Sequence, residues 1–214
     1  MGSSTAYHLM RGDPSLSVVV VERDSSYARA STTLSDGNVR IQFNLEENIR
    51  MSQYALEVLR TFDDDMATAS FKPEVGARHQ GNLFLADEEG KPDALQGIET
   101  QRRLGCEVAW LSSEEISLRF PGLRLDGIAG GSFAQVDGSV DPSAVLRGFR
   151  NKAAEMGAQY VDEEVVELLS IEGAIDGARL RSGADLTSPV VIDCAGAWSP
   201  TWPGPWGSSF PSSR

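Results

Sequence analysis

The strongest structural signal in this chain is the run Ser17-Val-Val-Val-Val-Glu-Arg23. Four consecutive valines are stiff at χ1, which disfavours a helix, and they are apolar enough to be buried on both faces of a sheet. The run therefore predicts an inner strand of a parallel sheet covered by helices. Glu22 closes the run twenty positions after Gly2. A dinucleotide-binding fold places the carboxylate that binds a ribose hydroxyl at about this spacing.

A short helix is predicted upstream, over residues 3–11, ended by Gly12 and Pro14. Glycine, helix, strand and acid together form the second half of a βαβ phosphate-binding unit. A complete unit would begin with an apolar strand and two more glycines before Gly2, so we expect a chain truncated at its start, with the first strand missing. Taken with Glu22 alone, Gly2 is as consistent with an ordinary helix cap as with a phosphate site.

Several stretches together resemble one flavoprotein family. Near the start these are Gly2-Ser-Ser-Thr-Ala-Tyr-His-Leu9, Val18-Val-Val-Val-Glu-Arg-Asp24 and Ala30-Ser-Thr-Thr-Leu-Ser-Asp-Gly-Asn-Val-Arg40. They look like the amino-terminal region of the FAD-dependent D-amino-acid oxidase superfamily, which includes glycine oxidase, sarcosine oxidase and dimethylglycine dehydrogenase. Val190-Val-Ile-Asp-Cys-Ala-Gly-Ala-Trp-Ser199 resembles the family's later flavin-contacting strand and turn. The resemblance covers roughly residues 2–200 in collinear order.

The resemblance implies an α/β fold with an incomplete, Rossmann-like FAD-binding domain and an inserted α+β portion of a substrate domain. It implies FAD as the cofactor, and it allows no catalytic residue to be named in this chain. The residues themselves predict no metal site. The residues that it places at the cofactor are Gly2, Ser3, Glu22, Arg23, Ala30, Ser31, Thr32, Thr33, Gly37, Arg40, Val165, Cys194, Ala195, Gly196 and Trp198.

These residues have different implied roles. By the resemblance, the loop from Ala30 to Gly37 passes under the flavin pyrophosphate and ring, and Val165 supports the adenine through its backbone. Gly196 would permit close approach of the cofactor, and Trp198 would wall the site, although a tight turn with a core tryptophan is the alternative. Arg40 either faces the flavin and substrate or lies on the surface.

The pattern changes over residues 71–136, where short β-like runs at 81–86 and 130–135 are separated by helical segments. Strands that do not alternate with helices suggest a second sheet, inserted into the nucleotide-binding domain. We therefore predict an FAD-binding domain at 1–70 and 137–200, an insertion at 71–136 and a disordered tail at 201–214.

Further elements are predicted on either side of the insertion. An apolar face at helical spacing follows Asn48 and predicts a packing helix. A second helix starts at Asp141-Pro142 and stops at Gly157. Strands are expected at 163–169, 178–181 and 186–193, the last interrupted by Pro189. The face after Asn48 consists of Ile49, Met51, Tyr54, Ala55, Val58, Leu59 and Phe62.

Composition narrows the possible partners. The 214 residues carry 31 acids and 19 bases, a formal net charge of -12, and no basic cluster, so nucleic acid is not an expected partner. No apolar run approaches the roughly 20 residues of a membrane span, and no signal pattern is present. We expect a cytoplasmic protein, unless a segment that preceded this sequence carried a targeting signal. The two cysteines share no metal-ligand spacing and suggest reduced thiols.

Two hypotheses of different classes follow. The first is a piece of an FAD-dependent oxidoreductase that oxidises the C–N bond of an amino acid or of a secondary or tertiary amine, and that is inactive as this piece. The resemblance implies it, because relatives carry most substrate-binding side chains in a carboxyl-terminal half beyond this chain. The alternative is a non-catalytic assembly or interaction protein that keeps the flavoprotein fold. A nicotinamide dehydrogenase fits poorly, because the motif at 194–199 resembles the flavin family. Oligomeric state and electron acceptor are not predicted.

Overall fold

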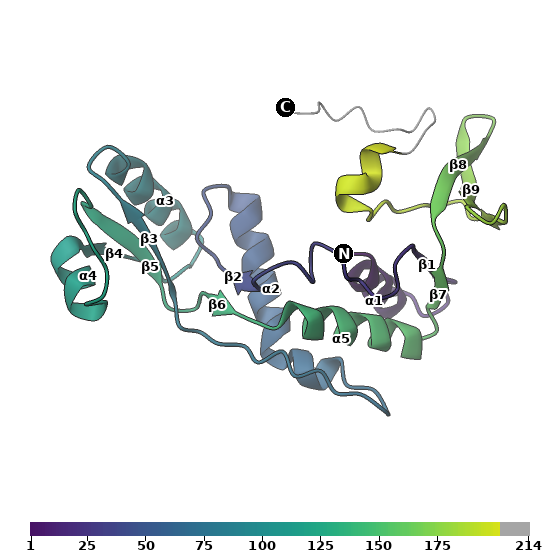
Figure 1. Cartoon of the computed structure of the whole chain (residues 1–214), viewed down its shortest axis with the longest axis horizontal. Helices are drawn as coiled ribbons and strands as arrows, with labels where there is room; N and C mark the ends of the chain where they lie inside the picture. Colours follow the sequence, from purple (N-terminus) through teal and green to yellow (C-terminus); the bar gives the residue numbers. More distant parts are fainter. Residues whose placement is uncertain (202–214) are drawn as a thin grey trace. The chain divides into compact units, whose positions relative to one another are not determined.

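The computed structural model describes residues 1–201, and the chain forms two compact units (Figure 1). Unit 1 comprises Met1–Leu34, Thr68–Phe71 and the chain from Leu146 onward. Unit 2 comprises Ser35–Ala67 and Lys72–Val145. Each unit is considered by itself below.

Unit 1 is built on a parallel strand pair with a helix beside it. Helix α1 (Gly2–Gly12) is followed by β1 (Val19–Glu22), which pairs in parallel with β7 (Gln159–Asp162). α1 buries Ala6, Tyr7 and Met10, and the Tyr7 ring lies 5.6 Å from that of Phe149 in α5 (Pro142–Glu155), which belongs to unit 1 from Leu146 onward. The predicted order of helix, strand and terminal acid is confirmed.

The remaining strands of unit 1 form an antiparallel sheet of three. β8 (Val165–Ile171), β9 (Ala174–Leu180) and β10 (Asp185–Thr187) pair in the order β10-β9-β8. The β8–β9 turn places Glu172 at φ 51° and Gly173 at φ 82°, as a two-residue hairpin with both turn residues at positive φ requires. A 3-10 helix, η1 (Gly196–Thr201), ends the described part of the chain.

Two strand predictions in unit 1 are wrong in part. β1 is not an inner strand, because β7 is its sole partner strand within residues 1–201. It is not buried on both faces either, since Val19 is 40% exposed. The strand expected at 186–193 is limited to β10, and the apolar residues that follow are not in a strand; Val190 is 66% exposed and Ile192 is 50% exposed. An extended segment becomes a strand only when another backbone pairs with it, and no described residue does so there. β7 was not predicted.

Unit 2 contains an antiparallel sheet with helices on both faces. β3 (Asn82–Ala86), β4 (Ala109–Ser112) and β5 (Gly130–Ala134) pair in the order β3-β5-β4. Ala134 clusters with Ile98 of α3 (Lys91–Arg103), while Arg119 of α4 (Ser113–Arg119) stacks on Phe133. Because neighbouring residues of a strand point to opposite faces, α3 and α4 lie on opposite faces of the sheet. The second sheet that the sequence predicted in this region is present.

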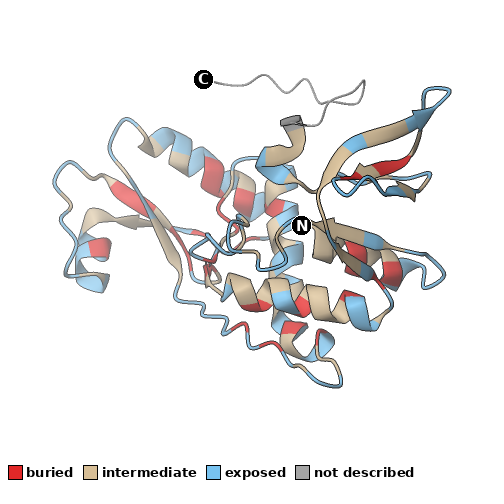
Figure 2. Ribbon diagram, turned by 45° about the vertical axis from the view of Figure 1, so that its right-hand side comes forward, coloured by how far each residue is buried: buried red, intermediate tan, exposed pale blue. Residues whose placement is uncertain are grey.

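The ends of these elements have local causes. Ser112 caps α4 by accepting a hydrogen bond from the backbone N–H of Glu115, whose carboxylate accepts one from the N–H of Ser112, and the two bonds form a capping box. A further short pair joins β2 (Asn38–Val39) to β6 (Gly138–Ser139). Figure 2 shows buried residues spread over helices, strands and connecting segments.

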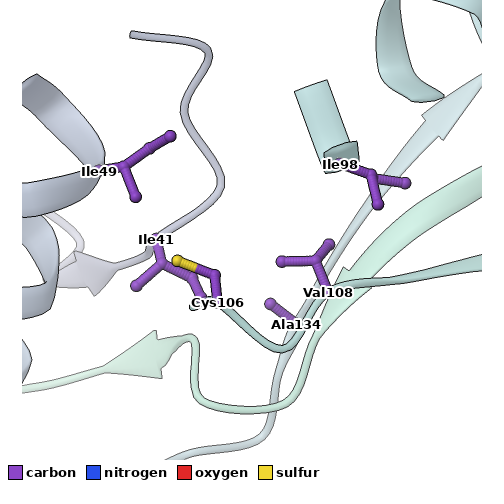
Figure 3. Close-up of a cluster of buried hydrophobic side chains, with 6 residues drawn as sticks. All are labelled: Ile41, Ile49, Ile98, Cys106, Val108 and Ala134. Atoms are coloured by element: carbon purple, nitrogen blue, oxygen red, sulfur yellow. The ribbon is translucent and has the colours of Figure 1, made fainter. Parts of the chain in front are cut away.

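The core of unit 2 draws on residues far apart in the sequence (Figure 3). Helix α2 (Glu46–Asp65) contributes Ile49, which is fully buried, and the segment before it contributes Ile41. The predicted apolar face of this helix is partly wrong, because Met51 is 62% exposed and Tyr54 is 54% exposed. The complete cluster is Ile41, Ile49, Ile98, Cys106, Val108 and Ala134.

This core explains why the compact units differ in extent from the predicted domains. Residues 35–67 were assigned to the nucleotide-binding part, but Ile41 and Ile49 pack into the core of unit 2. The function of each domain stays a prediction. Within the tail predicted to be disordered, residues 202–214 lie outside the described part of the chain.

Candidate functional site

The two motifs that the sequence singled out meet in unit 1. A Cβ atom placed on Gly2 would lie 3.7 Å from Cβ of Cys194 and 3.8 Å from Cγ1 of Val20. The Thr5 hydroxyl lies 3.7 Å from Sγ of Cys194, within hydrogen-bonding range of a sulfur. The first turn of α1, the valine strand and the later turn therefore converge on one place, although 192 positions separate Gly2 from Cys194.

The first turn of α1 offers hydrogen-bond donors. The helix begins at Gly2 with Met1 as its N-cap, and no side chain caps it. The first intrahelical bond closes from Thr5 N–H to the Met1 carbonyl at 3.0 Å, so the N–H groups of the preceding residues have no helical acceptor. Aligned N–H groups and the helix dipole suit an anion at this end of α1.

Glu22 lies at the carboxyl end of β1 and is half-buried. One carboxylate oxygen, Oε1, accepts a hydrogen bond from the backbone N–H of Asp24 at 3.0 Å. Within residues 1–201 the other oxygen, Oε2, accepts none. The side chain is thus held by one oxygen and has the second available to a hydroxyl donor.

Arg23 and Trp198 join the strand to the later turn. The Arg23 guanidinium lies 4.2 Å from the centre of the Trp198 indole, a cation–π contact. The backbone of the turn is fixed by Ala195 N–H, which donates to Asp193 Oδ1 at 2.8 Å, and by Trp198 N–H, which donates to the Ala195 carbonyl at 3.2 Å. Trp198 is half-buried beside the strand's terminal residues, so the alternative of a core tryptophan is not what the structure shows.

Val165 begins a strand near Glu22, although the two residues are far apart in the sequence. The N–H of Glu163 donates to the Glu22 carbonyl at 3.1 Å, and β8 begins two residues later at Val165. Val165 is half-buried at the start of that strand. Its backbone is therefore near the carboxyl end of β1, where the resemblance implied an adenine.

Within the described residues, no hydrogen bond joins the loop at Ala30–Thr33 to the place where Gly2 and Cys194 approach each other. Ala30 N–H donates to the Tyr27 carbonyl at 3.0 Å, and Leu34 N–H donates to the Ala30 carbonyl at 3.1 Å. These bonds make a local turn, in which Ser31 and Thr33 are exposed. A role of this loop in cofactor binding stays a prediction.

Gly37 and Arg40 belong to unit 2. Gly37 has φ +73°, and a Cβ on it would lie 2.1 Å from the Val140 carbonyl oxygen, so close approach of the chain itself already requires glycine there. Arg40 is half-buried, with its guanidinium 4.5 Å from the Phe43 ring and 5.0 Å from the Phe84 ring. The choice between a flavin-facing and a surface role for Arg40 stays open.

Sequence reasoning missed two buried polar groups. Asp137 in unit 2 is fully buried, and it accepts hydrogen bonds from Ile41 N–H at 2.8 Å and Gln42 Nε2 at 2.9 Å. Burial raises the pKa of Asp137, and the hydrogen bonds from Gln42 and Ile41 partly oppose that rise. In unit 1 the Tyr160 hydroxyl is buried near Ser3 without a hydrogen bond of good geometry, and burial raises the pKa of Tyr160. Neither residue belongs to a motif, because partners from distant segments create both environments.

Two other features of the described residues bear on the kind of site. Within residues 1–201 no group of three or more histidine, cysteine, aspartate or glutamate side chains is arranged to hold a metal ion. In that part of the chain, too, no helix is both long and apolar enough to span a bilayer.

Comparison with known proteins places this geometry in a family. Residues 1–211 match the family described as FAD dependent oxidoreductase. The chain belongs to this family of FAD-dependent oxidoreductases. The predicted membership of the D-amino-acid oxidase superfamily, the fold class and FAD as the family's cofactor are thereby confirmed.

Named relatives of this FAD-dependent oxidoreductase are consistent with that assignment. The chain is 32% identical to FAD-dependent oxidoreductase domain-containing protein 1 of Bos taurus, over 93% of this chain and 46% of that protein. It is 25% identical to glycine oxidase of Bacillus licheniformis, over 93% of this chain and 52% of that enzyme. The crystal structure of L-proline dehydrogenase from P. horikoshii has the same fold, with a TM-score of 0.81 at 24% identity over 94% of this chain and 51% of the other. The chain thus spans about half the length of each of these three proteins.

Proposed function

We propose that this chain supplies the adenine-nucleotide side of the FAD site in an oxidoreductase that acts on the C–N bond of an amino acid or of a secondary or tertiary amine. The observation that carries the proposal is the meeting of Gly2 with Cys194 beside β1, with the free oxygen of Glu22 at the end of that strand. The substrate class follows relatives named for glycine and L-proline.

The residues of unit 1 fit the adenosine diphosphate half of FAD. The unpaired N–H groups at Gly2 and Ser3 suit a pyrophosphate, and Oε2 of Glu22 suits a ribose hydroxyl. Arg23 and Trp198 present a flat cationic and aromatic pair at the same end of the strand, and the backbone at Val165 supports the adenine. The remaining contacts are proposed for Ala30, Ser31, Thr32, Thr33, Gly37, Arg40, Cys194, Ala195 and Gly196.

The chemistry belongs to the cofactor. Bound FAD supplies the isoalloxazine that accepts a hydride equivalent from the carbon next to the amine nitrogen. The part of this chain is to orient the nucleotide, with Glu22 as the residue that selects the ribose. No residue of this chain is proposed as a catalytic acid or base.

The test is binding of FAD and FMN to the purified chain, measured by equilibrium dialysis. FMN carries the same ring system but lacks the adenosine half, so we expect FAD and ADP to bind and FMN to bind far more weakly. Replacement Glu22→Gln keeps the shape of the side chain but removes its charge, and it is expected to weaken FAD binding by about tenfold.

The matched control is Glu172→Gln, which removes an equally negative side chain from the exposed β8–β9 turn of the same unit. It should leave FAD affinity unchanged. A colourless protein that takes up neither FAD nor ADP would contradict the proposal and favour the alternative, an assembly protein that keeps the flavoprotein fold.

We further propose that residues 1–214 are a part of a longer oxidoreductase and do not oxidise an amine alone. Two observations support this: the chain spans 46% of its Bos taurus relative, and β1 has one free edge within the described residues. A strand edge with apolar side chains and unpaired backbone groups favours aggregation.

Residues encoded upstream, added to the amino end of the chain, should therefore supply a strand that pairs with the free edge of β1. We expect higher soluble yield and higher FAD content per chain than for residues 1–214, measured after the same purification. Equal solubility and equal flavin content would count against a missing strand. The cytoplasmic location and the absence of a nucleic-acid partner stay predictions.

A further inference from the structure

An open depression in unit 2 shares no lining residue with the residues proposed for FAD. It has a volume of about 300 Å³, at the lower end of the sizes of small-ligand sites. It is formed where β4 and β5 meet the end of α4. Its lining is Glu107, Val108, Ala109, Arg119, Phe133 and Gln135.

The floor of this depression is apolar and ordered by packing. Phe133 is 5% exposed and Val108 is 4% exposed, so both side chains are almost entirely held within the unit. Ala109 pairs with Phe133 across β4 and β5. The exposed apolar part of the lining is therefore Ala109, whose methyl group a small apolar group of a ligand would cover.

Arg119 is held in place on one side of the depression. Its guanidinium stacks on the Phe133 ring at 3.9 Å from the ring centre, and its Nη2 donates to Gln135 Oε1 at 2.9 Å. The Gln135 amide in turn donates to the His79 carbonyl at 2.7 Å. One face and one donor of Arg119 are therefore used to fix its position, and its other N–H groups have no acceptor within residues 1–201. A guanidinium fixed in this way is suited to a carboxylate.

Glu107 lines the same depression with the opposite charge. Within the described part of the chain neither Glu107 nor Arg119 forms an ion pair, with each other or with any other residue. Two unpaired opposite charges beside an apolar floor are complementary to a molecule that carries both charges and a small apolar group. A free α-amino acid with an aliphatic side chain has this chemistry.

We propose that this depression binds a free aliphatic α-amino acid, with its carboxylate at Arg119, its ammonium group at Glu107 and its side chain over Ala109. This site goes beyond the proposed function, because it shares no residue with the FAD site and carries out no chemistry. It can be tested without flavin, so the failure of one proposal leaves the other intact.

The experiment is a titration of the ¹⁵N-labelled chain with L-valine, followed by the backbone amide signals of Ala109, Phe133 and Gln135. Two analogues each lack one charge: isovalerate lacks the ammonium group, and isobutylamine lacks the carboxylate. We expect saturable shifts with L-valine in the millimolar range and about fivefold weaker binding of each analogue, as for exposed ion pairs.

Two variants test which residue binds which charged group of the ligand. Arg119→Gln should weaken the binding of L-valine and isovalerate but leave the binding of isobutylamine unchanged. Glu107→Gln should weaken the binding of L-valine and isobutylamine but leave the binding of isovalerate unchanged. Arg124→Gln is the control, since Arg124 is exposed, pairs with Asp126 and lies outside the depression. The amide spectrum itself reports whether each variant is folded. Absence of saturable shifts at these residues, or equal binding of all three compounds to all variants, overturns the proposal.

Discussion

Replacement of Asp137 by alanine is expected to lower the free energy of unfolding of unit 2 by about 3 kcal/mol. The side chain is fully buried and is the acceptor for Ile41 N–H and for Gln42 Nε2. Alanine would leave the Ile41 N–H buried without a partner, and the Gln42 amide would keep only its bond to the Asn82 carbonyl at 3.0 Å. A buried unpaired donor costs about 1–3 kcal/mol. The measurement is urea denaturation, combined with hydrogen exchange of the Ile41 amide, which reports on this unit alone.

Two control variants separate the lost hydrogen bonds from the lost charge. Asp137→Asn keeps one acceptor oxygen and should cost about 1 kcal/mol. Asp126→Ala removes a carboxylate that is 84% exposed and paired with Arg124 at 2.9 Å, and it should change stability by less than about 0.5 kcal/mol. An unchanged exchange rate of the Ile41 amide in Asp137→Ala would show that the buried acceptor does not hold this segment.

The same series has a defined pH dependence. Burial raises the pKa of Asp137 in the folded protein above its ordinary value of 3.8. The folded state therefore binds this proton more readily than the unfolded state, and the stabilisation is fully present below that ordinary value and lost as pH rises through the folded pKa. Asp137→Asn lacks this proton, so its loss of stability relative to the wild type should be largest in acid and smaller near neutral pH.

Replacement of Gly37 by alanine is expected to cost about 3 kcal/mol, through strain and overpacking together. The residue has φ +73°, where a side chain is strained whatever the space around it, and the added Cβ would lie 2.1 Å from the Val140 carbonyl oxygen. That carbonyl belongs to the backbone next to β6, whose pairing with β2 the new methyl group would disturb. Thermal or urea denaturation measures the loss.

Two further glycines make the comparison quantitative. Gly76 has φ +56° with no atom within 4 Å of an added Cβ, so Gly76→Ala measures strain alone and should cost about 1 kcal/mol. Gly122 has neither the positive φ nor a close neighbour, so Gly122→Ala should be neutral or slightly stabilising. If Gly37→Ala proved no worse than Gly76→Ala, close approach to Val140 would not explain this glycine, and its predicted contact with the cofactor would remain as the reason.

Local sequence was sufficient for the elements that carry their own signals. The valine run is a strand and the segment before it is a helix, as predicted, because β-branched stiffness and the helix stop act within a few residues. The capping box at Ser112 is equally local. The family resemblance added what spacing alone could not, namely that Cys194 and Gly2 belong to one site, and the 3.7 Å approach of their Cβ positions agrees with it.

Pairing and burial could not be predicted in this way. Val190 and Ile192 have the composition of a strand, yet they are not in one, because a strand exists only when a second backbone satisfies its N–H and C=O groups. Met51 and Tyr54 match the apolar face of α2 but are exposed, because helical spacing does not say which part of a helix another element covers. β7 was missed because only its parallel partner, β1, makes it a strand.

The sequence alone identified this chain as an α/β protein of an FAD-dependent family through the resemblance of its motifs to that family, because each motif is a run of neighbouring residues. The tertiary structure alone decided that Ile41 and Ile49 pack with Ala134, that Asp137 is buried between Ile41 and Gln42, and that Arg119 rests on Phe133. Each of these facts depends on contacts between segments far apart in the chain. Such contacts follow from the summed free energy of packing the whole unit, which no single stretch of sequence contains.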